Sequence, residues 1–355
     1  MRINIDKLRD EIYKVANDLY RTRSFTDYKS KVISFLSLYQ TYIDLTGTPL
    51  DLSVLDNKFY VPYLKQKPGH LKETTATYFD NQSMHTELAN VILITFQLNG
   101  FLDLNRELSE TIIPKKKQLD IVRGFLSDFD IRLYNHFNHM LESGLIDDSE
   151  DKLDNNTTYF VCTLDKSYSV VDNCKRIDEL STLMHEVAHS YVQSDSLIRS
   201  RKQALEFHKS FYELYSMYTE YSFHNYLKKN HIYIRDALLT ENAHYSALRT
   251  YSSTLNKCGQ IGKDTFIDTD DLSFIVDAYE YTYALYLGLL LHEKSLSDKE
   301  GTTERIDDFI AYQGLLDYDK QLEILGFTRD NIKDGKILSK RLKEHNNNLR
   351  KYGHI

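Results

Sequence analysis

Hydrophobic residues near the start of the chain recur every three or four positions, which is the spacing of one face of an α-helix. Two segments follow this period: Ile5, Leu8, Ile12, Val15 and Leu19, and then Val32, Phe35, Leu36, Tyr39 and Tyr42. All four prolines lie before residue 115, and Leu, Ile and Tyr keep helical spacing after it. The pattern therefore predicts two amphipathic helices, followed by a C-terminal two-thirds that is mostly α-helical.

Two stretches depart from the helical pattern. Residues 47–82 carry Gly and Pro at several positions, which predicts an irregular connection. Residues 159–164 are rich in β-branched and aromatic residues, a composition typical of a strand. We therefore expect a mainly α-helical protein with a small β element. We divide it into a mostly helical N-terminal lobe, residues 1–150, and a second region, residues 151–355.

The charge balance narrows the possible partners. The chain has 52 acidic and 44 basic residues, a net charge of -8, and no stripe of Lys and Arg, so we expect no nucleic-acid partner. It opens on charged amphipathic sequence without the apolar core of a signal peptide, and no run of about 20 apolar residues follows. We therefore expect a cytoplasmic protein that does not bind membranes. The composition leaves the oligomeric state open.

The most informative motif is His185, Glu186 and His189, which form an H-E-x-x-H pattern. Two His at positions i and i+4 of a helix lie on one face, so both imidazoles can bind the same metal ion. Zinc in a catalytic site takes such ligands and keeps a position for water, and a neighbouring carboxylate can take the proton of that water. The motif predicts one zinc per chain, held by the two His, with Glu186 as the general base of peptide hydrolysis.

A third zinc ligand is expected downstream. Glu206, Glu213 and Glu220 are separated by seven residues each and so share one helix face. A charge at every seventh position is also the usual pattern of a solvated helix face. Spacing alone therefore does not choose among the three carboxylates.

The order H-E-x-x-H followed by E-x-x-S-x-x-x-E, here Glu213, Ser216 and Glu220, resembles the oligoendopeptidase F and thimet oligopeptidase family of zinc metallopeptidases. The resemblance implies that Glu213 is the third ligand, completing a ligand set of the gluzincin type. It places Glu220 where its carboxylate could accept the outward N–H of a zinc-bound His. The similarity spans roughly residues 155–350.

The resemblance also implies which segments of this chain form the active-site cleft. Residues 159–164 correspond to a strand that lines the substrate, and residues 306–327 to a closing helical pair. The family's tyrosine-rich helix is similar to residues 279–288, and the register anchored on Gly288 implies that Tyr283 donates its phenol to the oxyanion. Tyr281 and Tyr279 are the alternative donors. The spacing of Tyr279, Tyr283 and Tyr286 at i, i+4 and i+7 is also typical of a helix face that packs in a core.

The chain departs from the family pattern at three points. Residues 271–277 lack the His and Tyr that members usually carry just before the tyrosine helix, so we consider His244 as a possible oxyanion or substrate-binding residue. Ala188 replaces a Gly within the zinc motif. Most members are also much longer, which implies a reduced N-terminal lobe here.

Together these residues predict a helical zinc-metallopeptidase catalytic domain whose small β element lines the active-site cleft. The expected activity is that of an oligopeptidase-type metalloendopeptidase acting on short, unstructured peptides. One alternative is a dedicated processing peptidase for a single secreted or modified peptide. Another is a non-catalytic peptide-binding protein built on a peptidase scaffold.

Overall fold

The computed structural model describes most of the chain. The described residues are 4–19, 21, 25–48, 50, 82–104, 111–148, 156–161, 166–171, 174–199, 211, 213–259, 269–312 and 316–352.

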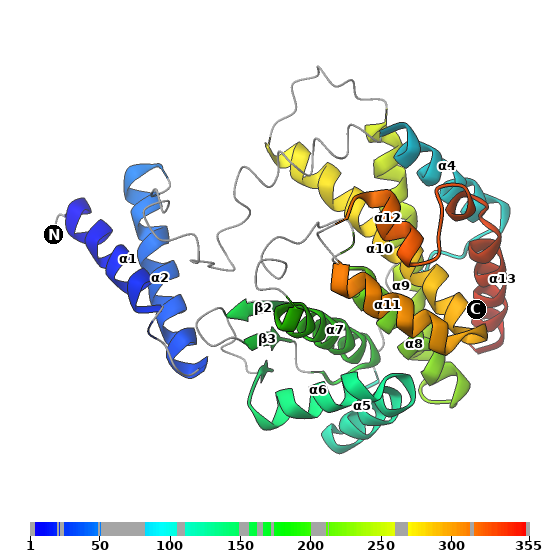
Figure 1. Cartoon of the computed structure of the whole chain (residues 1–355), viewed down its shortest axis with the longest axis horizontal. Coiled ribbons are helices and arrows are strands. Elements are labelled where there is room, and N and C mark those ends of the chain that lie inside the picture. Colours follow the sequence, from blue (N-terminus) through cyan, green and yellow to red (C-terminus); the bar gives the residue numbers. More distant parts are fainter. Residues whose placement is uncertain are drawn as a thin grey trace.

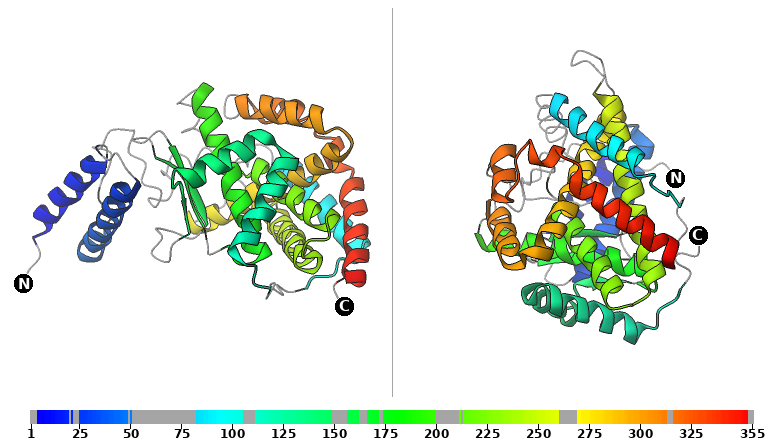
Figure 2. Two further views of the ribbon diagram at one scale, coloured as in Figure 1. Left: turned by 90° about the horizontal axis from the view of Figure 1, so that it is seen from below. Right: turned by 90° about the vertical axis from the view of Figure 1, so that its right-hand side faces the viewer.

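The described part of the chain is mainly α-helical, as the sequence predicts (Figure 1). The amphipathic pattern at the start forms α1 (Ile5–Leu19) and α2 (Phe25–Thr46), which pack against each other at one end of the molecule (Figures 1 and 2). The helices that follow are α4 (Gln82–Leu98), α5 (Lys115–Phe129), α6 (Ile131–Glu142), α7 (Ile177–Arg199), α8 (Leu214–Lys229), α9 (Ile234–Cys258), α10 (Thr269–Ser297), α11 (Lys299–Tyr312), α12 (Tyr318–Ile324) and α13 (Lys336–Tyr352), with a 3₁₀ turn at Asn331–Lys333.

The small β element is a three-stranded sheet with the order β1-β3-β2. Strand β3 (Lys166–Val170) pairs in parallel with β1 (Ile146–Asp147) and antiparallel with β2 (Thr157–Val161). The strand expected at residues 159–164 thus exists and begins two residues earlier. Because β3 is central, β2 forms one edge of the sheet, and both strands pack against α7.

Side chains from the sheet also fix the position of α7. The hydroxyls of Thr158 on β2 and Ser169 on β3 donate to the backbone carbonyl of Glu186, at 2.9 Å and 3.3 Å. Further along the helix, Ser167 donates to the side chain of Gln193 at 2.8 Å. Since these hydroxyls are buried, each needs a partner, and α7 supplies it. The sheet therefore holds the helix that carries the H-E-x-x-H motif.

Two large hydrophobic clusters form the core. One joins α4 and part of α7 with the helices from α8 to α13. The other joins α5, α6, the sheet and the first half of α7, and it also includes residues of α1, α2, α8 and α9. Helix α4, which lies on the N-terminal side of the boundary we place at residue 150, packs extensively against α9. The division into two lobes at residue 150 remains a prediction.

Helices α8 and α10 approach each other closely at Gly288. A Cβ atom at this position would lie 2.9 Å from Cβ of Met217 and 3.0 Å from the backbone nitrogen of Tyr218. Any larger residue would push the two helices apart, so Gly288 sets their distance. This contact fixes where the tyrosines of α10 lie relative to α8.

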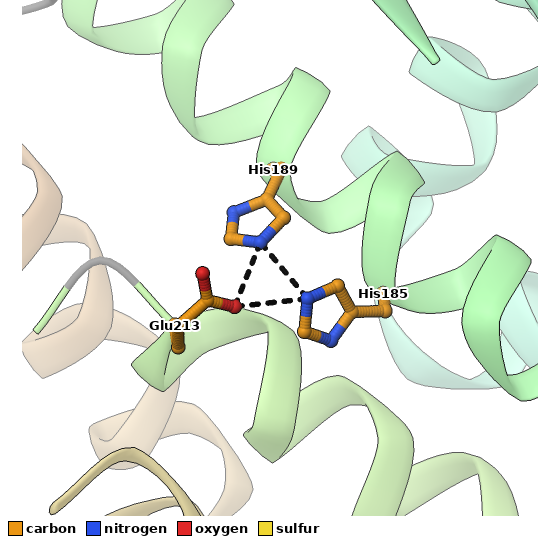
Figure 3. A group of neighbouring side chains, drawn as sticks. All are labelled: His185, His189 and Glu213. Atoms are coloured by element: carbon orange, nitrogen blue, oxygen red, sulfur yellow. Dashed lines mark hydrogen bonds and ion pairs between the residues drawn. The ribbon is translucent and has the colours of Figure 1, made fainter. Parts of the chain in front are cut away.

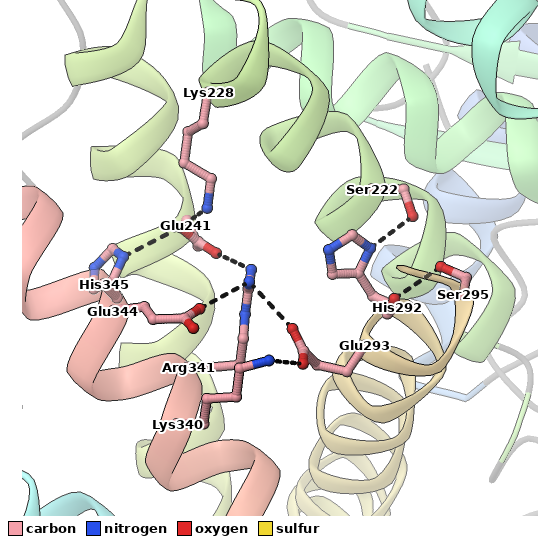
Figure 4. Close-up of polar contacts among 10 residues, drawn as sticks. All are labelled: Ser222, Lys228, Glu241, His292, Glu293, Ser295, Lys340, Arg341, Glu344 and His345. Atoms are coloured by element: carbon pink, nitrogen blue, oxygen red, sulfur yellow. Dashed lines mark hydrogen bonds and ion pairs between the residues drawn. The ribbon is translucent and has the colours of Figure 1, made fainter. Parts of the chain in front are cut away.

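A buried ionic cluster attaches the last helix, α13, to the core (Figure 4). Glu241 on α9 is 1% exposed and meets Lys228 of α8 at 2.5 Å, His345 at 3.1 Å and Arg341 at 3.3 Å. Arg341 also lies 3.3 Å from Glu293 on α10. Charges this deeply buried are tolerated only when they are paired, so the four helices depend on one another here.

No helix in the described part of the chain combines the length and the apolar character that crossing a bilayer requires.

Candidate metal centre

Helices α7 and α8 bring His185, His189 and Glu213 together (Figure 3). One turn of α7 separates the two His, whose ring centroids are 4.6 Å apart. Glu213 occupies the residue just before α8 begins. Its Oε2 atom lies 2.9 Å from Nε2 of His185 and 3.0 Å from Nε2 of His189, and the two nitrogens are 2.9 Å apart. Two imidazoles and one carboxylate therefore converge on one point.

The chemistry of these donors suits a cation. Nδ1 of His185 lies 2.8 Å from a carboxylate oxygen of Glu220, which only accepts, so this nitrogen carries a proton. In neutral His185 the Nε2 lone pair then faces the carboxylate of Glu213, another acceptor. Such an arrangement is repulsive unless a proton or a metal ion lies between the atoms. Two nitrogens and one carboxylate oxygen are the ligand set of a catalytic zinc site, so the residues fit this metal.

The same contacts shift the ionisation of the ligands. Burial lowers the pKa of His185, but hydrogen bonds to Glu213 and Glu220 outweigh it and hold this pKa well above its usual value. Burial raises the pKa of Glu213, but His189 and His185 outweigh burial and hold it well below the usual range. The centre therefore favours a negatively charged Glu213 with a positive charge beside it. A bound metal ion would supply that positive charge.

Glu186 is suited to proton transfer. Its side chain is buried, and its Oε2 atom has no hydrogen-bond partner among the described residues. Burial raises the pKa of its carboxyl group, although His185 and His189 oppose the shift. A buried carboxylate oxygen without a partner carries an energetic cost, which is typical of functional groups that await a ligand.

Glu220 links the centre to α9. One carboxylate oxygen, Oε1, accepts the hydrogen bond from His185, and the other, Oε2, accepts one from Ser181 at 2.6 Å. The same Oε2 lies 3.2 Å from Nε2 of His244. Ser181 also lies 2.8 Å from Nε2 of His224. The structure thus places Glu220 in contact with His185, a proposed zinc ligand, where the resemblance implies it should lie. It also places Ser181, His244 and His224 around this carboxylate.

The tyrosines of α10 are arranged differently from our expectation. Tyr279, Tyr283 and Tyr286 are at most 1% exposed, and the hydroxyl of Tyr283 is hydrogen-bonded to Nδ1 of His85 on α4 at 2.8 Å. These three side chains belong to the core. We therefore correct the assignment of Tyr283 as the phenol that faces the metal ligands.

Tyr281 lies on the opposite face of α10, because two residues turn a helix by about 200°. The negative charge of Glu213 is the largest cause that raises the pKa of Tyr281, and burial adds to it. Its ring stacks on that of Tyr251 from α9, with centroids 5.1 Å apart and an interplanar angle of 15°. Of the three candidate tyrosines, Tyr281 is the one whose pKa is raised by the charge of Glu213, and Tyr279 and Tyr283 lie on the buried face of the helix.

Two further candidates from the sequence are His244 and Glu206. The structure places His244 against Glu220, whereas the sequence suggested it as a possible oxyanion or substrate-binding residue. Glu206 lies outside the described residues. The sequence motifs do not include Ser181 and His224, although each lies one helical turn from a motif residue, four before His185 and four after Glu220.

Solved structures of similar fold come from peptidases. A putative oligoendopeptidase F from Bacillus anthracis superposes with a TM-score of 0.53 at 12% identity, covering 91% of this chain and 63% of that one. PZ peptidase A gives a TM-score of 0.50 at 8% identity, covering 96% and 66%. A putative peptidase from Chlamydophila abortus gives 0.50 at 14% identity, covering 97% and 63%.

This chain therefore spans less than two-thirds of the length of these structures. No protein-family model matches the sequence, and no curated protein does. The chain has the fold of oligoendopeptidase F and related peptidase structures.

Proposed function

We propose that this protein is a zinc-dependent endopeptidase that hydrolyses short, unstructured peptides. The observation that carries the proposal is the convergence of His185, His189 and Glu213 near a buried Glu186 oxygen that has no hydrogen-bond partner among the described residues. The likeness of the fold to peptidase structures supports it. His185, His189 and Glu213 would hold one zinc ion per chain.

A bound zinc would supply the Lewis acidity that makes water nucleophilic at neutral pH. Glu186 would take a proton from the attacking water and pass it to the nitrogen of the departing amine. The phenol of Tyr281 would donate a hydrogen bond to the oxyanion that develops on the scissile carbonyl. Glu220 would keep His185 in the tautomer that presents Nε2 to the centre.

The sheet offers a way to bind an extended peptide. Among the described residues, β2 pairs with β3 on one side only, so an extended peptide would add to its other edge as a further strand. The hydroxyl of Thr158 on β2 donates to the carbonyl of Glu186, which places this edge beside the motif helix. A peptide added to β2 would be held mainly through its backbone, so this mode favours unstructured segments over folded proteins.

Metal removal and restoration test this function. A library of internally quenched fluorescent peptides would be incubated with the purified protein, with protein treated by a chelator, and with treated protein after zinc is restored. We expect cleavage, loss of cleavage and recovery, in that order. Cleavage within the peptides identifies an endopeptidase, and a few preferred cleavage sequences would indicate a processing peptidase. A zinc-loaded protein that binds these peptides without cleaving them would support the binding-protein alternative instead.

A further inference from the structure

We propose that His244 on α9 is a positioning residue that acts through Glu220 to hold the zinc ligand His185. The proposal rests on the proposed function and extends it to a third helix. It assigns His244 to neither the oxyanion nor the substrate. In this role, His244 would strengthen zinc binding without touching the metal.

The geometry of Glu220 carries the proposal. Oε1 accepts from His185 at 2.8 Å, and Oε2 faces both Ser181 at 2.6 Å and His244 at 3.2 Å. The side chains of Glu220 and His244 are only 6% and 16% exposed. Because little water reaches this carboxylate, its neighbours must supply its hydrogen bonds. Without His244, Oε2 of Glu220 would keep only Ser181 as a partner in the described part of the chain.

Counting protons fixes the direction of each hydrogen bond. A carboxylate has no proton to donate, so His185 and Ser181 donate to Glu220, and Nε2 of His244, 3.2 Å from Oε2, must carry a proton to interact favourably with it. Ser181 has a single hydroxyl proton, and it points to Glu220, so His224 must donate its Nε2 proton to Ser181. The chain of donors ends at His185, whose Nδ1 proton is held by Glu220. Nε2 of His185 is thereby left without a proton, and its lone pair would bind the metal.

The neighbouring rings hold His244 in place. Its imidazole stacks on that of His224, with centroids 5.0 Å apart and an interplanar angle of 29°. The ring of Tyr221 lies 5.6 Å away. These contacts restrict the rotation of the imidazole, so that Nε2 stays directed at Glu220. Helix α9, which contributes no proposed zinc ligand, would thus help to set the orientation of His185.

The variant His244→Phe tests this role because it keeps a ring for stacking and removes the Nε2 donor. His244→Gln, which retains an N–H donor, is the conservative variant. His292→Phe is the matched control, since His292 is a buried imidazole that bonds to Ser222 on α8, at 3.1 Å. The melting temperature of each metal-free protein would show that it folds.

Zinc affinity, measured by chelator competition, is the principal readout. We expect His244→Phe to weaken zinc binding about 10-fold, the lower end of the loss typical when the direct partner of a metal ligand is removed, because His244 acts one step further away through Glu220. His244→Gln should recover part of this loss, and His292→Phe should bind zinc like the wild type. The visible spectrum of the Co²⁺-substituted protein should change in His244→Phe and not in His292→Phe.

A double-mutant cycle separates action through Glu220 from an independent effect. If His244 acts through Glu220, adding His244→Phe to Glu220→Gln should weaken zinc binding no further. Additive losses would overturn the proposal, as would unchanged zinc affinity in His244→Phe. Two zinc ions per wild-type chain, one of them lost in His244→Phe, would instead identify Glu220, His224 and His244 as a second metal site. A wild-type protein that binds no zinc would contradict the proposed function itself.

Discussion

Nδ1 of His185 on α7 donates a hydrogen bond to Oε1 of Glu220 on α8, at 2.8 Å. This bond settles which nitrogen of His185 faces Glu213 and His189. It also means that the zinc motif depends on a residue 35 positions away in the sequence. The consequences of this arrangement can be tested at the metal centre, at α10 and in the core.

The first prediction concerns the third ligand. Glu213→Ala removes the carboxylate oxygen that lies within 3.0 Å of both ring nitrogens, so most of the bound zinc should be lost after gel filtration. Glu206→Ala is the comparison, because Glu206 shares the seven-residue spacing. Zinc measured by emission spectroscopy should remain near one ion per chain in that variant. Equal zinc in both variants would contradict the ligand assignment.

The second prediction concerns the phenol near the metal ligands. Tyr281→Phe should lower kcat with little change in KM, because an oxyanion donor acts mainly in the transition state. Loss of one such donor costs about 2.7–4 kcal/mol in other enzymes. Steady-state kinetics on a fluorogenic peptide would measure the effect. A normal kcat in Tyr281→Phe would remove Tyr281 from the mechanism.

Tyr283→Phe should behave in the opposite way. It removes the hydroxyl that is bonded to the buried ring of His85, so the free energy of unfolding should fall by about 1–3 kcal/mol. The activity per folded molecule should stay the same. Urea unfolding and kcat measured on the same preparation would check both points. A large kcat loss without loss of stability would restore Tyr283 as the oxyanion donor.

The fourth prediction concerns the buried ionic cluster. Glu241→Ala leaves Lys228 and Arg341 without their shared carboxylate, and removing one partner of a buried pair typically costs about 3–5 kcal/mol. Glu87→Ala is the control, since Glu87 is exposed and pairs with Lys333 at the surface, where a pair is worth about 1 kcal/mol or less. Urea unfolding that finds equal costs for the two variants would show that the cluster does not stabilise the packing of α13.

The sequence predicts local features of this protein well. The positions of His185 and His189 follow from helical geometry alone, because residues four apart share a face. The helix at residues 5–19 likewise follows from hydrophobic spacing, and the structure confirms it with the same bounds. Choosing Glu213 over Glu206 required the resemblance to a family, since equal spacing made the carboxylates indistinguishable.

Features that depend on contacts between distant segments were not predictable in this way. The register anchored on Gly288 selected Tyr283, but the partner of Tyr283 is His85, which lies 198 residues earlier in the chain. No local pattern reveals that contact, which places the Tyr283 hydroxyl in the core, while Tyr281 on the opposite face of α10 is the tyrosine whose pKa is raised by the charge of Glu213. His244 was considered from its residue type alone. Its place beside Glu220 follows from the packing of α9 against α8, which one sequence does not disclose.

The most direct test of the account compares zinc content and peptide cleavage in wild-type protein and Glu186→Gln. The substitution keeps the size of the side chain and removes its ability to accept a proton. We predict about one zinc per chain in both proteins and a loss of turnover of roughly 10²-fold or more in Glu186→Gln. Glu87→Gln should match the wild type in both measurements. Undiminished cleavage by zinc-loaded Glu186→Gln would contradict the proposal that this carboxylate is the general base.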